Sequence, residues 1–373
     1  MDRFLNHTLS KLKDTHSYRT LPDQVSGSDA SLIVFNTNDY LGLTTDYSRI
    51  QAGLAAANHY GAGATGSRLL SGQYPTLCDL ESALSIRLGK SALVVNSGYH
   101  ANTGLLGCLP QRSDLILADR ACHASLIDGA RLSAATFKRY RHTDYDHLGY
   151  LIQKHRANYN RLFIVTESLF SMTGASCNFE RLIQLKCDAK AQLIVDEAHA
   201  VGCYGPSGMG LADAHHILDA VDIIIGTFGK AWGSMGAFIG GSPELRDYLI
   251  NRCRPFIYST ALPPFVAGVN LATVTQNHSQ HQLALATLTR YCHTTLPTGC
   301  SPTAKQHIVP LPVGCPEKAL AYTHALAQQG IIATAIRHPT VPKHTDLIRI
   351  SLRANHRLSD IDQLATAWHS IQT

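Results

Sequence analysis

The sequence has no long hydrophobic run and no paired cysteines. It contains ten cysteines in 373 residues, but none stands in a CxxC pair or at a zinc-like spacing with histidine. This pattern disfavours both a metal site and a disulfide framework. No window approaches the length of a membrane span, and the first residues, MDRFLNHTLSKLKD, lack the apolar core of a signal peptide. We therefore expect a soluble, cytoplasmic protein that binds no metal and no membrane.

Charged residues are also scarce. They make up 16% of the chain, the net charge is only +5, and apolar residues make up 45%, which is typical of a compact enzyme. The one dense basic run, KRYR at 138–141, is too short to indicate nucleic-acid binding. We expect this run to end a helix or to lie in a loop that faces the substrate, where it would weakly favour an acidic partner.

A nucleotide-binding loop is missing as well. The glycine-rich segment GAGATGSRLLSG (61–72) is not followed by GK[ST], so it does not match a phosphate loop of the nucleotide type. The motif DEAH at 196–199 also occurs in helicases, but that function needs an upstream GxxxxGK[ST]. Here Gly229-Lys230 lies downstream and is followed by Ala231. Nucleotide hydrolysis is therefore excluded.

The central part of the chain alternates between apolar strands and helical or loop segments. Strands are predicted at 91–99, 114–119, 161–168, 192–199 and 221–228, and a helix is predicted at 77–88. Strands of this kind indicate an α/β fold, with a mostly parallel sheet covered by helices on both faces.

The pattern changes near residue 264. A long helical stretch (264–295) precedes short extended segments at 307–314, 330–338 and 347–354, which predict a smaller α+β domain with an antiparallel sheet. Residues 1–20 predict an amphipathic helix, and 31–43 a strand and a polar turn. We therefore divide the chain into an N-terminal helix and arm (1–45), a large domain (46–263) and a small C-terminal domain (264–373).

Polar side chains follow the predicted strands at the points where the strands end. Ligands of parallel sheets bind beyond the carboxyl ends of the strands, so we expect these side chains to share one site. They are His123 after 114–119, Ser171 after 161–168, Asp196 and His199 at the end of 192–199, and Thr227 and Lys230 at the end of 221–228.

These residue types suit an aldehyde cofactor. The amine of Lys230, which lies among three glycines, can form a Schiff base, and Asp196 can pair with the protonated ring nitrogen of pyridoxal phosphate (PLP). The backbone at Ser97-Gly98-Tyr99 and the Thr227 hydroxyl can bind a phosphate, although an ordinary βα turn explains that segment equally well.

Two histidines and a serine complete the expected site. His123 can lie over the ring, and His199 or Ser171 can bond its phenolic oxygen. Each residue alone can also be explained without a cofactor, for example as a histidine of the core or as a solvated lysine. Their joint placement at consecutive strand ends favours the cofactor site.

Seven segments then resemble the α-oxoamine synthases. They are NDYLGL (38–43), GSRLLSG (66–72), NSGYHAN (96–102), ESLFSMTG (167–174), DEAHAVGCYGPSGMG (196–210), GTFGKAWGSMGAFIGG (226–241) and FIYSTALPP (256–264). Members of this family are fold-type I PLP enzymes that join an amino acid to an acyl thioester with loss of carbon dioxide. The resemblance runs from about residue 30 to the C-terminus.

The resemblance assigns roles to individual residues. It implies that Lys230 carries the cofactor, that Asp196 pairs with the pyridinium, and that His123 stacks on the ring and contacts substrate. Ser171, His199 and Thr227 would bind the cofactor, and the backbone at Gly98 and Tyr99 would lie near its phosphate. Thr340 and Arg349 match substrate-binding positions, and Arg19 is a further match. Ser259 and Thr260 would reach the phosphate of a neighbouring subunit, which implies a homodimer with shared active sites.

The segments AIRHPTVP (335–342) and LIRISLRANH (347–356) are most similar to members that condense L-alanine with a pimeloyl thioester. Departures from the usual pattern occur at Leu77, Thr173, Ala175, His338 and Arg353, and they bear on the acyl substrate rather than on the reaction type. The acyl carrier, coenzyme A or an acyl carrier protein, stays open. Sister activities with glycine and acetyl-coenzyme A, or with serine and a long acyl thioester, remain alternatives. A non-catalytic partner subunit is disfavoured because Lys230 is present.

Overall fold

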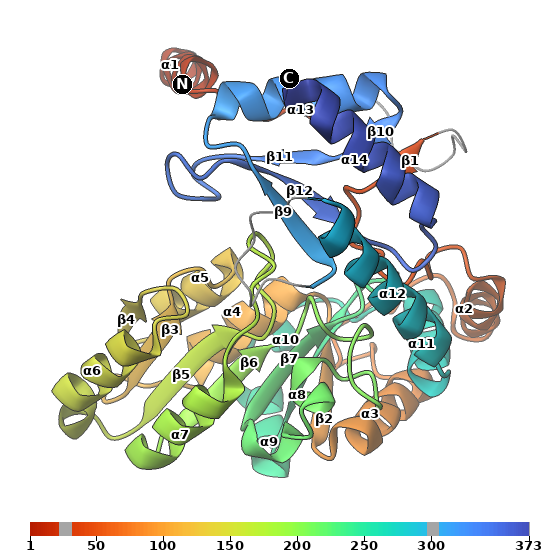
Figure 1. The fold of residues 1–373 in the computed structure, drawn as a ribbon. Helices are drawn as coiled ribbons and strands as arrows, with labels where there is room; N and C mark the ends of the chain where they lie inside the picture. Colours follow the sequence, from red (N-terminus) through yellow and green to blue (C-terminus); the bar gives the residue numbers. More distant parts are fainter. Residues whose placement is uncertain (22–31, 297–305, 373) are drawn as a thin grey trace. The chain divides into compact units, whose positions relative to one another are not determined.

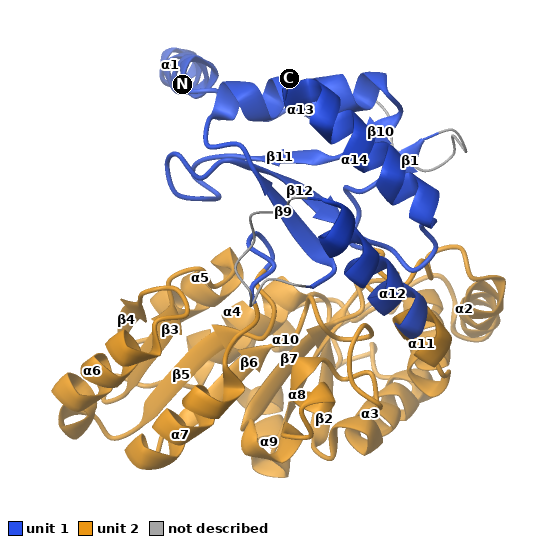
Figure 2. Ribbon diagram, in the orientation of Figure 1, with its two compact units in different colours: residues 1–38, 171–175, 283–373 blue, residues 39–170, 176–282 orange. Residues whose placement is uncertain are grey.

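The computed structural model describes residues 1–21, 32–296 and 306–372, which form two compact units (Figure 2). Unit 1 comprises residues 1–38, 171–175 and 283–373, and unit 2 comprises residues 39–170 and 176–282. The domain boundaries at residues 45 and 263 stay a prediction, and each unit is described here by itself.

A seven-stranded sheet organises unit 2 (Figure 1). Its order is β2-β8-β7-β6-β5-β3-β4, and β8 alone runs against the other strands of this sheet. The strands are β2 (Ser91–Val95), β3 (Leu115–Asp119), β4 (Thr136–Tyr140), β5 (Leu162–Glu167), β6 (Gln192–Asp196), β7 (Ile223–Thr227) and β8 (Ala237–Gly241). The predicted, mostly parallel sheet is thereby confirmed.

Helices cover both faces of this sheet. Alternate residues of the strands point to opposite faces, and every residue of β3, β5, β7 and β8 is buried, as expected for a sheet with two covered faces. The helices of unit 2 are α2 (Tyr47–Tyr60), α3 (Pro75–Leu88), α4 (Gly98–Cys108), α5 (Ala124–Leu132), α6 (Tyr145–His155), α7 (Phe179–Ala189), α8 (Leu211–Ala214), α9 (Pro243–Arg252), α10 (Arg254–Ile257) and α11 (Pro264–Thr275).

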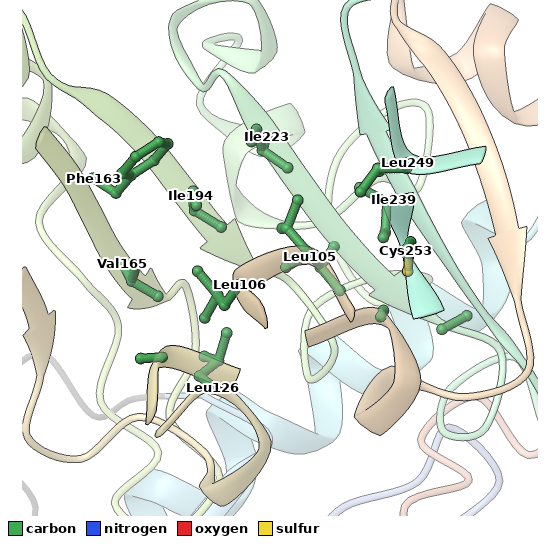
Figure 3. Close-up of a cluster of buried hydrophobic side chains, with 14 of the residues drawn as sticks. Leu105, Leu106, Leu126, Phe163, Val165, Ile194, Ile223, Ile239, Leu249 and Cys253 are labelled. Carbon is green, nitrogen blue, oxygen red and sulfur yellow. The ribbon is translucent and has the colours of Figure 1, made fainter. Parts of the chain in front are cut away.

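The core on one face of the sheet is aliphatic. Leu105 and Leu106 of α4 and Leu126 of α5 lie over the strands β5, β6 and β7 (Figure 3). Each of these leucines is fully buried, and burial of one such side chain contributes about 1.5–3 kcal/mol. This packing fixes where α4 and α5 begin, which matters because both helices start at the carboxyl-end edge of the sheet.

Unit 1 contains two small sheets and its own helices. The antiparallel sheet β11-β12-β9 confirms the expected α+β pattern, and β1 pairs in parallel with β10. The elements are α1 (Asp2–Asp14), β1 (Ile33–Val34), β9 (Ile308–Pro312), α13 (Pro316–Gln328), β10 (Ile331–Ile332), β11 (Thr334–Ile336), β12 (Leu347–Ser351) and α14 (Leu358–Gln372). The helix α12 (Ser279–Thr295) begins in unit 2 and continues into unit 1.

Two local predictions were wrong. The basic run at 138–141 does not end a helix or form a loop, because Lys138 and Arg139 belong to β4, the edge strand of the large sheet. An edge strand tolerates exposed charged side chains, which hid the strand in the sequence. The expected helix at 264–295 is two helices, α11 and α12, separated by residues 276–278. None of the helices in the described ranges is long and apolar enough to cross a membrane.

Candidate active site

A cavity of about 170 Å³ lies at the carboxyl-end edge of the large sheet. The last residues of β5, β6 and β7 and the segments that follow β2, β3, β6 and β7 supply its lining. Seven of the sequence-predicted residues line this one cavity, namely Gly98, Tyr99, His123, Asp196, His199, Thr227 and Lys230. Asn102, Ser125, Glu167 and Ala198 complete the lining.

Lys230 lies in a tight connection between β7 and β8. The Thr227 hydroxyl donates to the carbonyl of Gly236 (2.9 Å) and accepts from the amide of Gly229 (3.1 Å), which closes the connection on itself. Gly233 has φ +55°, and a Cβ there would stand 2.9 Å from the amide nitrogen of Thr44. This position therefore needs glycine for its conformation and for space.

A buried arginine holds the same connection from outside. Arg49 is 1% exposed, and its guanidinium donates to the carbonyl of Trp232, to the carbonyl of Leu43 (2.5 Å) and to the hydroxyl of Thr273 (2.7 Å). A guanidinium presents its donors in a fixed planar fork, so three partners fix the backbone two residues beyond Lys230.

Asp196 is held by an asparagine from α4. The Asn102 amide donates to Asp196 Oδ2 (2.8 Å) and to Ser125 Oγ (2.9 Å), and the amide of Ala198 donates to Asp196 Oδ1 (2.9 Å). Asp196 and Asn102 are 5% and 2% exposed. The carboxylate is thus oriented from both oxygens in a nearly dry environment, where such charge-assisted bonds are strong.

A second carboxyl group, Glu167, lies beside Asp196. The two residues are partners in the register of β5 and β6, and Glu167 is 3% exposed. Burial, and then the charge of Asp196, raise the pKa of Glu167. Glu167 Oε1 accepts from the backbone amide of His123 (2.6 Å), so this carboxyl group also anchors the start of α5.

His123 is the N-cap of α5. Its Nδ1 accepts from the Ser125 amide (3.2 Å) and lies 2.7 Å from Ser125 Oγ, which fixes the ring orientation. The pKa of His123 is lowered, mainly by desolvation, with Lys230 adding to the effect and Asp196 opposing it. A lowered pKa favours the neutral imidazole at neutral pH.

His199 joins Lys230 to a buried tyrosine. His199 Nε2 is 2.7 Å from Lys230 Nζ, and its Nδ1 is 2.7 Å from the hydroxyl of Tyr40. His199 is 5% exposed and Tyr40 is fully buried. The imidazole is therefore held at both nitrogens.

Four predicted site residues belong to unit 1 and are described there. Arg19 Nη2 donates to the hydroxyl of Thr340 (3.0 Å), and Arg349 Nη2 donates to Asn38 Oδ1 (3.0 Å). Ser171 is the fourth predicted site residue that belongs to unit 1. In unit 2, Thr260 is exposed, bridges to Ser67 and accepts through its carbonyl from the Asn96 amide (2.5 Å).

The sequence reasoning missed Asn102, Glu167 and Tyr40. Asn102 had a signal, because its amide lies in the segment ANTGLLG (101–107), which consists mostly of small and apolar residues. Glu167 had a weaker one, as a carboxylate at the end of a buried strand. Tyr40 lies in the segment NDYLGL (38–43), but that segment gives no sign of its contact with His199, which lies 159 residues further along the chain.

The family model "Aminotransferase class I and II" matches residues 30–367 of the chain. The chain belongs to this family. The family confirms the fold-type I PLP transferase fold and the cofactor expected from the sequence.

Curated relatives and solved structures show to which group within this family the chain belongs. An "8-amino-7-oxononanoate synthase" of Chlorobaculum parvum is 42% identical over 97% of both chains. The serine palmitoyltransferase of Sphingomonas wittichii superposes with a TM-score of 0.91 at 28% identity and covers 99% of this chain and 96% of its own. A serine palmitoyltransferase of S. paucimobilis, solved with bound PLP and myriocin, superposes with a TM-score of 0.90 at 26% identity. It covers 98% of this chain and 96% of its own. This aminotransferase family member is thus an α-oxoamine synthase, a PLP-dependent acyltransferase.

The lining of the cavity fits PLP. It offers one amine, one oriented carboxylate, and the N-terminus of α4, where the first amides of a helix have no partner within the helix. A Cβ added to Gly98 would stand at an ordinary van der Waals distance, 4.0 Å, from the Cβ of Thr227, so there is free space beside the first residue of α4. Groups of three or more histidine, cysteine, aspartate or glutamate side chains that suit a metal ion do not occur in the described ranges.

Proposed function

We propose that this chain condenses L-alanine with a pimeloyl thioester to give 8-amino-7-oxononanoate, carbon dioxide and the free thiol carrier, as a step of biotin biosynthesis. The observation that carries the proposal is the 42% identity, over 97% of both chains, to a protein named for this product. A relative of Neisseria meningitidis, named a putative enzyme of the same kind, is 40% identical over 96% of the chain.

Lys230 and Asp196 are the proposed catalytic pair. When bound, PLP supplies an electron-accepting ring that stabilises negative charge at the α-carbon of the amino acid. Lys230 Nζ holds the cofactor and takes the α-proton of the substrate. Asp196, oriented by Asn102 and Ala198, keeps a proton on the ring nitrogen through a buried charge-assisted bond.

His123, Thr227 and the start of α4 complete the proposed cofactor site. The backbone at Gly98 and Tyr99 would bind the phosphate, because a helix N-terminus favours an anion. The Thr227 hydroxyl would join them by turning away from the Gly236 carbonyl to which it donates. The neutral His123 ring, fixed by Ser125, would bind the cofactor ring and would donate to the oxygen that gains charge when the thioester carbonyl is attacked.

The remaining roles fall on residues for which the described geometry gives only local partners. Arg349 binds the carboxylate of L-alanine, and Arg19 with Thr340 binds the acyl substrate. Ser171 and His199 bond the cofactor's phenolic oxygen. Thr260, with Ser259, reaches the phosphate of a second subunit in a cytoplasmic homodimer, and the thiol carrier is an acyl carrier protein or coenzyme A.

A second candidate has one observation in its favour. The serine palmitoyltransferase of S. wittichii covers 99% of this chain with a TM-score of 0.91. Its identity of 28% is well below the 42% of the relative from C. parvum, so condensation of serine with a long acyl thioester is the weaker candidate.

A thiol-release assay separates the candidates. Alanine, glycine and serine are crossed with pimeloyl, acetyl and palmitoyl thioesters, and kcat/KM is measured for each pair. The proposal predicts the highest value for alanine with the pimeloyl thioester, and no release by Lys230→Ala. A preference for serine with the palmitoyl thioester, or for glycine with the acetyl thioester, would contradict it.

A further inference from the structure

Tyr40, His199 and Lys230 form a hydrogen-bonded row in unit 2. The Tyr40 hydroxyl lies 2.7 Å from His199 Nδ1, and His199 Nε2 lies 2.7 Å from Lys230 Nζ. Tyr40 is fully buried and His199 is 5% exposed, so bulk water does not compete strongly for these bonds. The phenol can therefore influence the amine through the imidazole.

The direction of the first bond decides the direction of the second. A neutral imidazole has one N–H donor and one acceptor nitrogen. A phenol, with a pKa near 10, is a better donor than a neutral imidazole N–H, and the imidazole nitrogen is the better acceptor. Tyr40 O–H therefore donates to Nδ1, and the ring proton of His199 sits on Nε2.

A proton on Nε2 faces the amine of Lys230. An ammonium group has three donors and no acceptor, whereas a neutral amine has a lone pair that can accept this proton. We propose that Tyr40 is a positioning residue that holds His199 in the Nε2–H form and thereby favours the neutral, nucleophilic form of Lys230. The inference rests on the proposed role of Lys230 as the residue that holds PLP.

Other groups around Lys230 Nζ also affect the balance between its ammonium form and its neutral amine form. The titratable side chains that line the cavity with Lys230 are Tyr99, His123, Glu167, Asp196 and His199. The carboxylate of Asp196 favours the ammonium form, and Glu167 does so only when it is ionised, which burial opposes. Tyr40 opposes the pull of these carboxylates. Removal of its hydroxyl lets His199 take the Nδ1–H form and accept from an ammonium.

The test uses the full chain with Tyr40→Phe, which keeps the ring. In the cofactor-free protein, the rate of acylation of Lys230 by a small reagent is followed by peptide mass spectrometry across pH. We expect the midpoint of this profile to move to higher pH by about 0.5–1 unit, the size of one hydrogen bond. The same midpoint in Tyr40→Phe and wild type would overturn the proposal.

Tyr74→Phe is the matched control. Tyr74 is also buried, and its hydroxyl donates to the carbonyl of Leu262 rather than to a cavity residue. Loss of that hydroxyl should leave the Lys230 midpoint unchanged. An equal shift in Tyr74→Phe would show a general effect of a lost buried hydroxyl and would also overturn the proposal.

Two further measurements secure the result. In a His199→Asn background, Tyr40→Phe should produce no shift, and a persisting shift would refute action through His199. If Tyr40→Phe does not fold, NMR of the wild-type chain with ¹⁵N-labelled histidine reports the tautomer, with His199→Asn used for assignment. A proton on Nδ1 would contradict the proposal. If wild type binds no PLP, the proposed function fails, whereas the acylation profile still reports on Tyr40.

Discussion

Replacement of Glu167 by glutamine should flatten the pH dependence of stability. Burial and the neighbouring Asp196 raise the pKa of Glu167 from 4.5 to about 8 in the folded chain. Between these two values the folded state binds a proton that the unfolded state has released, so stability falls as pH rises. Glutamine is uncharged at every pH, and its carbonyl oxygen can still accept from the His123 amide, as Glu167 Oε1 does at 2.6 Å.

The size of the effect follows from proton linkage. One proton changes the free energy of unfolding by about 1.4 kcal/mol per pH unit while the folded group stays protonated. Between pH 6 and 8 the change is about 2.3 kcal/mol, because the folded group is half ionised at pH 8. At about 1.3 °C per kcal/mol for a chain of this length, the melting temperature of wild type should fall by about 3 °C more than that of Glu167→Gln. Glu197, whose pKa burial raises to about 7, adds the same slope to both proteins, so the difference isolates Glu167.

The assay is thermal unfolding of the cofactor-free chain from about pH 5.5 to 8.5. Glu180→Gln, an exposed glutamate on α7, is the control and should decline as wild type does. The reasoning is refuted if Glu167→Gln loses stability with rising pH as steeply as wild type.

Four other substitutions test the site. Lys230→Ala should lower kcat by at least about 10²–10⁴-fold, the range of a lost general base, and near-normal turnover would exclude that role. Asn102→Ala removes a donor to buried Asp196 and should weaken PLP binding by about tenfold in an absorbance titration; an unchanged Kd would mean that Asn102 does not orient this carboxylate. Arg19→Ala and Thr340→Ala should each raise KM for the acyl thioester about tenfold, and the double variant should add little, because the two side chains are bonded. Fully additive effects would contradict a joint role.

The large sheet was predictable because its strands are buried on both faces. In a chain with strand–helix alternation, a short run that begins with consecutive isoleucines, such as Ile223–Thr227, is best explained as a buried strand. The strand β8 (Ala237–Gly241) was not predicted, because its residues Gly240 and Gly241 lower strand propensity. A Cβ at Gly240 would lie 2.9 Å from Leu88, and one at Gly241 would lie 2.5 Å from Leu245. The need for glycine therefore arises from tertiary contacts, which the local sequence does not reveal.

Only the site residues that follow predicted strands could be predicted from the sequence. Asp196, Thr227 and Lys230 follow apolar runs, so the parallel topology alone predicts that they meet. Tyr40 and Arg49 reach the site through contacts with residues far along the chain, which no local pattern indicates. Asn102 could have been noticed as a polar residue in an apolar helix, but its partner Asp196 could not have been inferred from spacing.

If the cavity at the strand ends holds PLP through Lys230, reduction of the bound cofactor should attach it permanently to this lysine. The purified full chain is incubated with PLP, reduced with borohydride, digested and mapped by mass spectrometry. We expect a single pyridoxyl phosphate group, carried by the peptide that contains Lys230. A label on another lysine, or no stable label at all, would contradict it.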